Sequence, residues 1–273
     1  MELFGQSLPL IDFPRLKAIR GLGMSDHAGY AAILADKFDY TNTYYDREPR
    51  CDFTQEHPRQ YGAYDFILSA DVIEHIAPPI ERALDEVCRL LKPNGFFGLT
   101  IYCNPEDRVR EHFPGLHEFR VVPLGGREVL INRRTDGTLE IRDDLVFHGG
   151  SGATLEMREF GITELQSKLL AAGFLSAHFL SENIPDIGVL FDSDVSQPLV
   201  ARKQPYTMDR CAVTQLVSAW RAIADDIAAA GESAIRAEGR AGDLKAQMRY
   251  ASESRWLRLG RSLGVGPKFV IPE

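Results

Sequence analysis

The chain has 273 residues, of which 44% are hydrophobic, 26% charged and 10% aromatic, ordinary values for a folded globular protein. Its 31 basic and 39 acidic residues give a net charge of −8, which argues against an extended nucleic-acid-binding surface, because such a surface needs clustered basic residues. No apolar run reaches the roughly 18 residues of a membrane span. Glu2 stands where a secretory signal would be basic, and the four cysteines form no CxxC pair, so we expect reduced thiols, no metal and a cytoplasmic location.

The first third of the chain alternates short β-rich runs with an amphipathic stretch. Lys17–Gly21 is a candidate strand, and a glycine-bearing turn leads from it into an expected helix, Ala28–Lys37. Tyr40–Tyr45 and Arg50–Thr54 are further extended segments. Repeated strand-then-helix units predict an α/β fold around a parallel sheet.

The clearest strand is Tyr64–Ala70, an almost continuous apolar run that suits the interior of a parallel sheet. A helix over Pro79–Leu91 and a strand over Phe96–Tyr102 follow. Ligands of open parallel sheets lie beyond the carboxyl ends of the strands. Three ionisable residues come directly after the strand end, and we expect them in that crevice: Asp71, Glu74 and His75.

The segment from 104 to 205 is less regular. A hairpin is expected around Thr135–Gly137, and a helix over Ile162–Ala172 should end at Gly173, before two short strands over Ala177–Leu180 and Leu199–Ala201. His148 precedes a glycine loop that would cover the crevice. Glu156 and Arg158 follow this loop, either as part of the site or as a solvent-exposed ion pair. Two further histidines, His112 and His117, either contact the substrate or lie on the surface.

Residues 64–75 and 91–95 resemble the strand–turn and the LKPGG-type turn of class I S-adenosylmethionine-dependent methyltransferases of the type 11 kind. Residues 158–174 resemble the last helix of that group, and the resemblance covers roughly residues 17–203. It implies a doubly wound, Rossmann-like, mostly parallel sheet of seven strands, with S-adenosylmethionine as the cofactor. A Rossmann dehydrogenase is disfavoured, because the glycine pattern stops at two.

The first loop departs from the family pattern, which reads acidic-x-Gly-x-Gly-x-Gly. Arg20–Asp26 offers two glycines and no acidic residue at the strand end. By resemblance, Asp26 faces the amino-acid end of the cofactor, Asp46 or Glu48 holds the ribose, and Asp52 faces the adenine. The implied cofactor-binding residues are Gly21, Gly23, Ser25, Asp26, Asp46, Asp52, Phe53, Ser69 and Asp71. A rival alignment makes Lys17–Met24 the second strand and assigns Asp26 to the ribose.

The implied reaction is methyl transfer to an oxygen or a nitrogen, and the catalytic candidates are His75, Glu74 and His148. His75 and Glu74 have the alternative role of capping the following helix. Residues 24–45, 111–117 and 145–160 resemble a bacterial subgroup associated with surface-polysaccharide and glycosyltransferase loci. That resemblance favours a glycan or related small-molecule acceptor. The alternative function is a non-catalytic scaffold that has lost the glycine loop.

The composition changes near residue 205, which predicts a methyltransferase domain over 1–205 and a helical extension over 206–273. Residues 213–251 carry apolar or alanine positions at alternating three- and four-residue spacing, a coiled-coil seam that predicts either a homodimer or a helix packed on its own domain. Residues 236–268 hold eight basic and three acidic residues, so peripheral contact with a membrane or an acidic partner is a further expectation.

Overall fold

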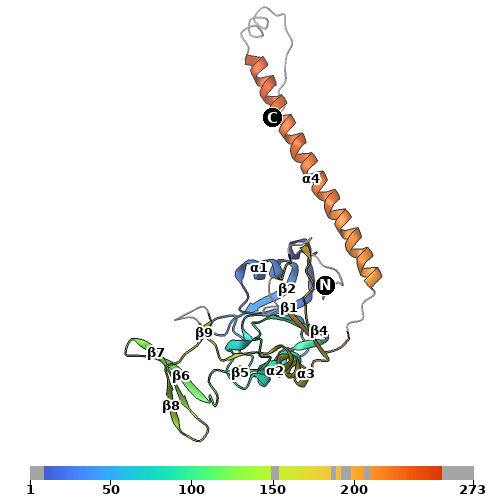
Figure 1. Ribbon diagram of the computed structural model, residues 1–273. Helices are drawn as coiled ribbons and strands as arrows, with labels where there is room; N and C mark the ends of the chain where they lie inside the picture. Colours follow the sequence, from blue (N-terminus) through green and yellow to red (C-terminus); the bar gives the residue numbers. More distant parts are fainter. Residues whose placement is uncertain (1–8, 149–153, 186–188, 192–197, 206–209, 254–273) are drawn as a thin grey trace, which may run out of the picture. The chain divides into compact units, whose positions relative to one another are not determined.

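The computed structural model describes residues 9–148, 154–185, 189–191, 198–205 and 210–253 (Figure 1). The chain divides into two compact units, Met1–Met208 and Asp209–Glu273, and each is described by itself. The second unit contains α4, Arg210–Glu253, one continuous helix of 44 residues that includes the predicted seam. None of the helices in these ranges combines the length and apolarity of a membrane span.

A mixed sheet forms the centre of the first unit, in the order β12-β13-β4-β3-β1-β2. Its first four strands along the chain are mutually parallel, and β13 runs antiparallel to both of its neighbours, β4 and β12. The mostly parallel sheet is therefore confirmed, but six strands are present in the described residues where seven were predicted. The strands are β1 (Leu16–Met24), β2 (Phe38–Thr43), β3 (Tyr64–Ala70), β4 (Leu91–Thr100), β12 (Ser176–Phe179) and β13 (Leu199–Arg202).

The extended segment expected at Arg50–Thr54 does not become a strand. A single bridge pairs Tyr44 with Arg50, and the chain then turns, because Asp52 Oδ1 accepts hydrogen bonds from Thr54 N at 3.0 Å and from Thr54 Oγ1 at 2.7 Å. An aspartate bonded to a backbone amide two residues on favours a turn over a ladder.

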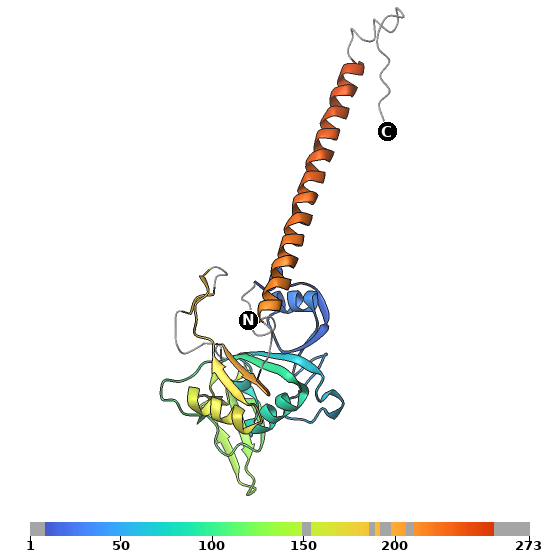
Figure 2. The same cartoon turned by 90° about the vertical axis from the view of Figure 1, so that its right-hand side faces the viewer.

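Helices cover both faces of the sheet, as the doubly wound prediction requires. On one face α1 (Ala28–Lys37) packs Leu34 into a cluster with Phe66 and Phe96. On the other face lie α2 (Ile80–Leu90) and α3 (Ile162–Ala171) (Figure 2). They share a core cluster with Ile67 and Phe97, the residues that directly follow Phe66 and Phe96 in β3 and β4. Successive strand residues point to opposite faces, so Phe66 and Ile67 define the two cores.

The glycine turn predicted within Arg20–Asp26 does not begin at Gly21, because β1 continues through both glycines to Met24. A Cβ on Gly21 would overlap the Phe66 ring, and one on Gly23 would overlap the Tyr40 hydroxyl. The glycines therefore make room for aromatic side chains of β3 and β2. The chain turns only at Ser25, whose φ is 56°.

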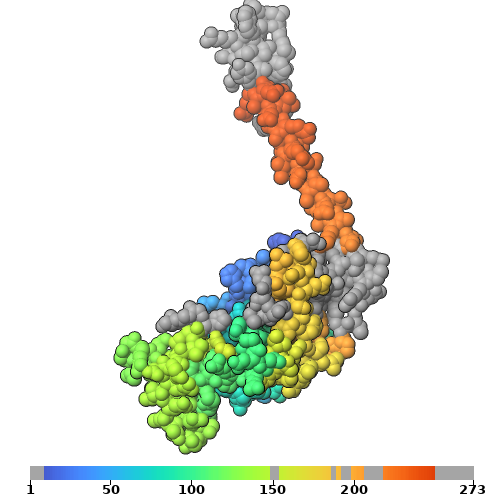
Figure 3. All heavy atoms as spheres, viewed as in Figure 1, coloured from blue at the N-terminus to red at the C-terminus, as the bar shows by residue number. Residues whose placement is uncertain are grey.

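A long insertion separates β4 from α3. The predicted hairpin at residues 135–137 is confirmed between β7 (Arg127–Arg133) and β8 (Leu139–Arg142), which form a small sheet with β6 (Glu118–Leu124) (Figure 1). In the space-filling view the atoms of this part of the chain, coloured green, gather at one end of the first unit (Figure 3). Two short ladders return the chain to the main sheet: β9 (Phe147–His148) pairs with β10 (Thr154–Leu155), and β5 (Arg110–Glu111) pairs with β11 (Arg158–Glu159). Short 3-10 helices cover Leu10–Asp12 (η1), Pro58–Gln60 (η2) and Ile73–His75 (η3).

Candidate functional site at the carboxyl edge of the sheet

Four parallel strands end along one edge of the main sheet. Met24 lies in register with both Thr43 and Ser69, and Ala70 with Thr100. The residues that follow β1 and β3, Ser25 and Asp71, have φ values of 56° and 52°. Non-glycine residues rarely adopt this left-handed conformation, and such residues gather at binding and active sites. The edge is also where ligands of open parallel sheets bind.

The predicted catalytic residues Glu74 and His75 lie in η3, directly beyond the end of β3. Three contacts attach η3 to the segment 155–158. His75 Nδ1 lies 2.9 Å from the Leu155 carbonyl oxygen, and the Met157 amide donates to the Glu74 carbonyl at 2.9 Å. Arg158 Nη1 donates to the Ile76 carbonyl at 2.6 Å. The turn that carries Glu74 and His75 is thus held by a segment 80 residues later in the chain.

Arg158 is fully buried, so of the two alternatives given for it the solvent-exposed ion pair is wrong. Its Nε donates to Glu111 Oε1 at 2.7 Å, across the β5–β11 ladder. Its Nη2 is also buried and has no hydrogen-bond partner among the described residues. A buried guanidinium is tolerated where carboxylate and carbonyl acceptors surround it, and here it fixes η3 to β11.

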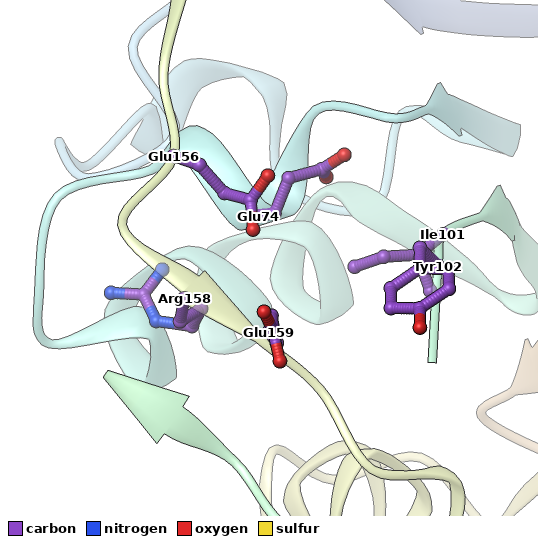
Figure 4. Close-up of a pocket in the computed structure, with 6 residues that line it drawn as sticks. All are labelled: Glu74, Ile101, Tyr102, Glu156, Arg158 and Glu159. Carbon is purple, nitrogen blue, oxygen red and sulfur yellow. The ribbon is translucent and has the colours of Figure 1, made fainter. Parts of the chain in front are cut away.

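A cavity of about 80 Å³ lies beyond the ends of β3 and β4. Figure 4 shows that its lining comes from η3, from the residues after β4, and from the segment at β11: Glu74, Ile101, Tyr102, Glu156, Arg158 and Glu159. Burial raises the pKa of Glu74 to about 7, and the negative charges of Asp71 and Glu156 add to the shift. A carboxyl group that titrates near neutral pH can accept or return a proton during a reaction.

The tautomer of His75 follows from its partner. A carbonyl oxygen only accepts hydrogen bonds, so Nδ1 carries the proton that it donates to Leu155, and Nε2 holds the lone pair in the neutral ring. Nε2 lies 3.8 Å from Glu74 Oε1. The side chain of the third catalytic candidate, His148, lies outside the described residues, although its backbone ends β9.

Three of the predicted cofactor residues gather at the carboxyl edge: Ser25, Ser69 and Asp71. Ser69 is 2% exposed, and its Oγ has no hydrogen-bond partner in the part of the chain that is described. The two left-handed turns and this buried hydroxyl fit a polar ligand such as S-adenosylmethionine lying across the strand ends. The glycine pair does not fit the predicted cradle, because Phe66 and Tyr40 fill the space above it.

Asp26 already has partners inside the fold. Its carboxylate accepts hydrogen bonds from Tyr30 Oη at 2.8 Å and from Tyr40 Oη. Burial raises the pKa of Asp26, and these hydrogen bonds oppose the shift. Residues from the loop after β2 differ in exposure: Asp46 is exposed, Asp52 is bonded to Thr54, and Phe53 packs in the core. Their roles toward a cofactor stay predictions.

A second group of ionisable side chains meets beside the cavity. His112 Nε2 lies 3.0 Å from Glu156 Oε1 and 3.9 Å from Glu159 Oε1. These three residues are close because β5 pairs with β11. His112 and Glu156 are 44 residues apart in the sequence, so no local sequence pattern predicts their contact. His117, the other histidine of that segment, is exposed.

Residues 20–125 match the family model of a methyltransferase domain. The matched range contains the second half of β1 together with β2 to β4, α1, α2 and η3, and so it includes the carboxyl edge with Glu74 and His75. The match supports the class I methyltransferase resemblance at the level of this domain.

Among curated proteins, the chain is 27% identical over 124 residues to the ubiquinone/menaquinone biosynthesis C-methyltransferase UbiE of Rickettsia bellii (strain OSU 85-389), covering 45% of this chain and 49% of the relative. The corresponding protein of Rickettsia prowazekii (strain Madrid E) is 24% identical over the same length. The chain therefore spans about half the length of the curated relatives it matches.

Two solved structures illustrate the structural neighbours. One is the 1,6-didemethyltoxoflavin-N1-methyltransferase of Burkholderia thailandensis with bound S-adenosylhomocysteine, at 16% identity and a TM-score of 0.39, covering 71% of this chain and 72% of the neighbour. The other is the sugar N-methyltransferase KedS8 of Streptoalloteichus sp ATCC 53650, at 14% identity and a TM-score of 0.40, covering 68% and 81%. The TM-scores of both neighbours are low, so the fold assignment rests on the sheet topology and on the match of residues 20–125.

Proposed function

We propose that the protein is an S-adenosylmethionine-dependent methyltransferase whose cofactor lies across the carboxyl edge of β1 to β4. The observation that carries the proposal is the methyltransferase-domain match over residues 20–125, which spans this edge. Ser25, Ser69 and Asp71 would hold the cofactor there, with Asp46 or Glu48 at its ribose and Asp52 and Phe53 near its adenine. When bound, the cofactor supplies an activated methyl group on a sulfonium centre.

The acceptor atom is proposed to be a hydroxyl oxygen or an amine nitrogen that enters the cavity beside η3. A hydroxyl must lose a proton as the methyl group arrives, and the neutral His75 ring can take that proton at Nε2. Glu74, at 3.8 Å, would stabilise the imidazolium that forms. The Nδ1 contact to Leu155 holds the ring in the tautomer that this role requires.

A cell-surface glycan or a related small molecule is the proposed acceptor. The support is the resemblance of residues 111–117 and 145–160 to the glycan-associated subgroup, and these two segments also contribute Glu111, Glu156 and Arg158 to the surroundings of the cavity. A cytoplasmic location, where activated sugars are assembled, is part of the same proposal.

Two measurements test the activity. Calorimetric titration with S-adenosylhomocysteine should show one site per chain, with micromolar affinity. Transfer of labelled methyl from S-adenosylmethionine to a panel of nucleotide sugars and glycan fragments should then be detected, and His75→Ala should lower its rate by about 100-fold while cofactor affinity stays within a factor of about two. His117→Ala, an exposed histidine, is the matched control.

The non-catalytic scaffold remains the second candidate, because two observations favour it. Aromatic side chains fill the space above Gly21 and Gly23, and the Asp26 carboxylate is committed to Tyr30 and Tyr40. Absence of calorimetric heat at millimolar S-adenosylhomocysteine, together with absence of methyl transfer, would favour the scaffold over the enzyme.

We also propose that α4 pairs with α4 of a second copy. Ile223, Ile227 and Leu244 are 59%, 68% and 59% exposed, and a second seam is the simplest surface that would cover them. Contact of the basic C-terminal segment with a membrane or an acidic partner stays a prediction, because residues 254–273 lie outside the described ranges.

A further inference from the structure

We propose that His112, Glu156 and Glu159 bind one divalent cation at the rim of the cavity. One imidazole and two carboxylates converge there from two paired segments of the insertion. This site lies beside the proposed acceptor cavity but uses none of the residues proposed to hold the cofactor, and it revises the expectation from sequence that no metal is bound.

The geometry is close to that of a ligand set. One ligand atom from each residue lies within 4.8 Å of the others, and their side chains are only 11%, 17% and 24% exposed. Atoms that bond one ion at about 2.1 Å stand about 3 to 4 Å apart, so small rotations complete the set. The backbone is already held, because the His112 amide donates to the Met157 carbonyl at 2.9 Å.

The local charge favours a cation. Glu74, Glu156 and Glu159 all line the cavity, and the positive charge of Arg158 is engaged by Glu111 at 2.7 Å. Buried carboxylates are costly unless a cation or hydrogen bonds compensate them. An ion between His112, Glu156 and Glu159 would replace the direct contact between His112 Nε2 and Glu156 Oε1, which lie 3.0 Å apart.

A second observation points to a ligand in the same cavity. Arg158 lines it, is fully buried, and has an Nη2 without a hydrogen-bond partner among the described residues. An oxygen ligand of the cation, such as a hydroxide or a carboxylate, would accept from this group. The cavity of about 80 Å³ has room for such an oxygen.

The donor set restricts the metal. Imidazole with carboxylates suits Mn²⁺, Fe²⁺ and Zn²⁺, whereas Mg²⁺ and Ca²⁺ prefer oxygen alone. Mn²⁺ is the most selective probe here, because it binds thiols weakly and the chain carries cysteines that would compete for Zn²⁺.

The test uses the full chain after treatment with a chelator, titrated with Mn²⁺ while the electron paramagnetic resonance signal of the free ion is followed. We expect saturable binding of one Mn²⁺ per chain. His112→Ala, Glu156→Gln and Glu159→Gln should each weaken it by at least about tenfold. The controls are His117→Ala and Glu106→Gln, which alter an exposed histidine and an exposed glutamate of neighbouring segments and should leave binding unchanged.

Circular dichroism of each variant establishes that it is folded, and Glu159→Gln, the most conservative change at the least buried ligand, is the variant expected to keep the fold. No saturable binding, or equal affinity in the wild type and the folded ligand variants, would overturn the proposal. Binding of S-adenosylhomocysteine to the metal-free chain is measured separately, so failure of the metal site leaves the proposed methyltransferase untouched.

Discussion

His75 donates a hydrogen bond from Nδ1 to the main-chain oxygen of Leu155 at 2.9 Å, joining the turn after β3 to the segment before β11. One contact thereby sets both the position and the tautomer of a candidate base. Together with the Met157 and Arg158 contacts, it makes the orientation of η3 depend on the insertion.

Replacement of Arg158 should therefore destabilise the protein strongly. Arg158→Met would leave Glu111 and the carbonyls of Ile73 and Ile76 without their buried donor, and the free energy of unfolding should fall by about 3–5 kcal/mol. Urea denaturation measures the change. The control is Arg133→Met, whose ion pair with Glu118 is 62% exposed on both sides and should contribute less than about 1 kcal/mol. Equal losses in the two variants would contradict the role given to Arg158.

The glycines of β1 should be required for stability. Gly23→Ala would place a methyl group against the Tyr40 hydroxyl and the Asp26 carboxylate, and we expect a loss of about 1–3 kcal/mol, measured as a lower Tm. Gly231→Ala in α4 is the control, because nothing lies near its Cβ position and alanine is the better helix former. A Gly23→Ala protein as stable as the wild type would show that Tyr40 and Asp26 can move aside without loss of stability.

The ionisation of Glu74 should make stability depend on pH. Its pKa is raised from 4.5 to about 7 in the folded protein, so the folded state holds a proton that the unfolded state has lost between these values. The free energy of unfolding of the wild type should accordingly fall by up to about 3 kcal/mol as pH rises from about 4.5 to 7. Below and above this window, Glu74 should contribute little further change.

Glu74→Gln should remove that dependence. The variant should gain stability relative to the wild type as pH rises through the same window, when both are unfolded by urea with a chelator present. The groups that face Glu74 include His75, Asp71 and Glu156, and His75→Ala with intact Glu74 isolates the contribution of His75. A constant difference between wild type and Glu74→Gln from pH 4.5 to 8 would refute the raised pKa.

The seam of α4 should control the oligomeric state. Ile223→Glu with Ile227→Glu would place two charges in the proposed helix pair, and light scattering should show a monomer where the wild type is a dimer. Asp225→Ala with Asp226→Ala, between the seam positions, is the control and should remain a dimer. A wild type that stays monomeric at high concentration would rule out the pairing.

The sequence predicts the main elements of the first unit well, because each of them carries a local signal. The strand Tyr64–Ala70, the helix Ala28–Lys37 and the helix end at Gly173, whose φ is 98°, all agree with the structure. Hydrophobic periodicity and turn residues specify such elements without help from distant parts of the chain.

Only part of the candidate site can be predicted from the sequence, because only part of it lies next to an element with a local sequence signal. Glu74 and His75 follow a recognisable strand, whereas Glu159 and the burial of Arg158 depend on the β5–β11 ladder. The glycine pair misleads, because a glycine that admits an aromatic ring from a neighbouring strand has the same sequence signature as one that opens a turn.

The β5–β11 ladder has an evolutionary consequence. It places the entry and the exit of the segment between residues 111 and 158 on adjacent strands, opposite one another. A segment whose ends already meet can be lengthened, shortened or exchanged with little entropic cost to the rest of the chain. Related proteins can thus carry different segments at this point while keeping the same sheet, and the ladder residues mark the junctions at which such segments can be exchanged.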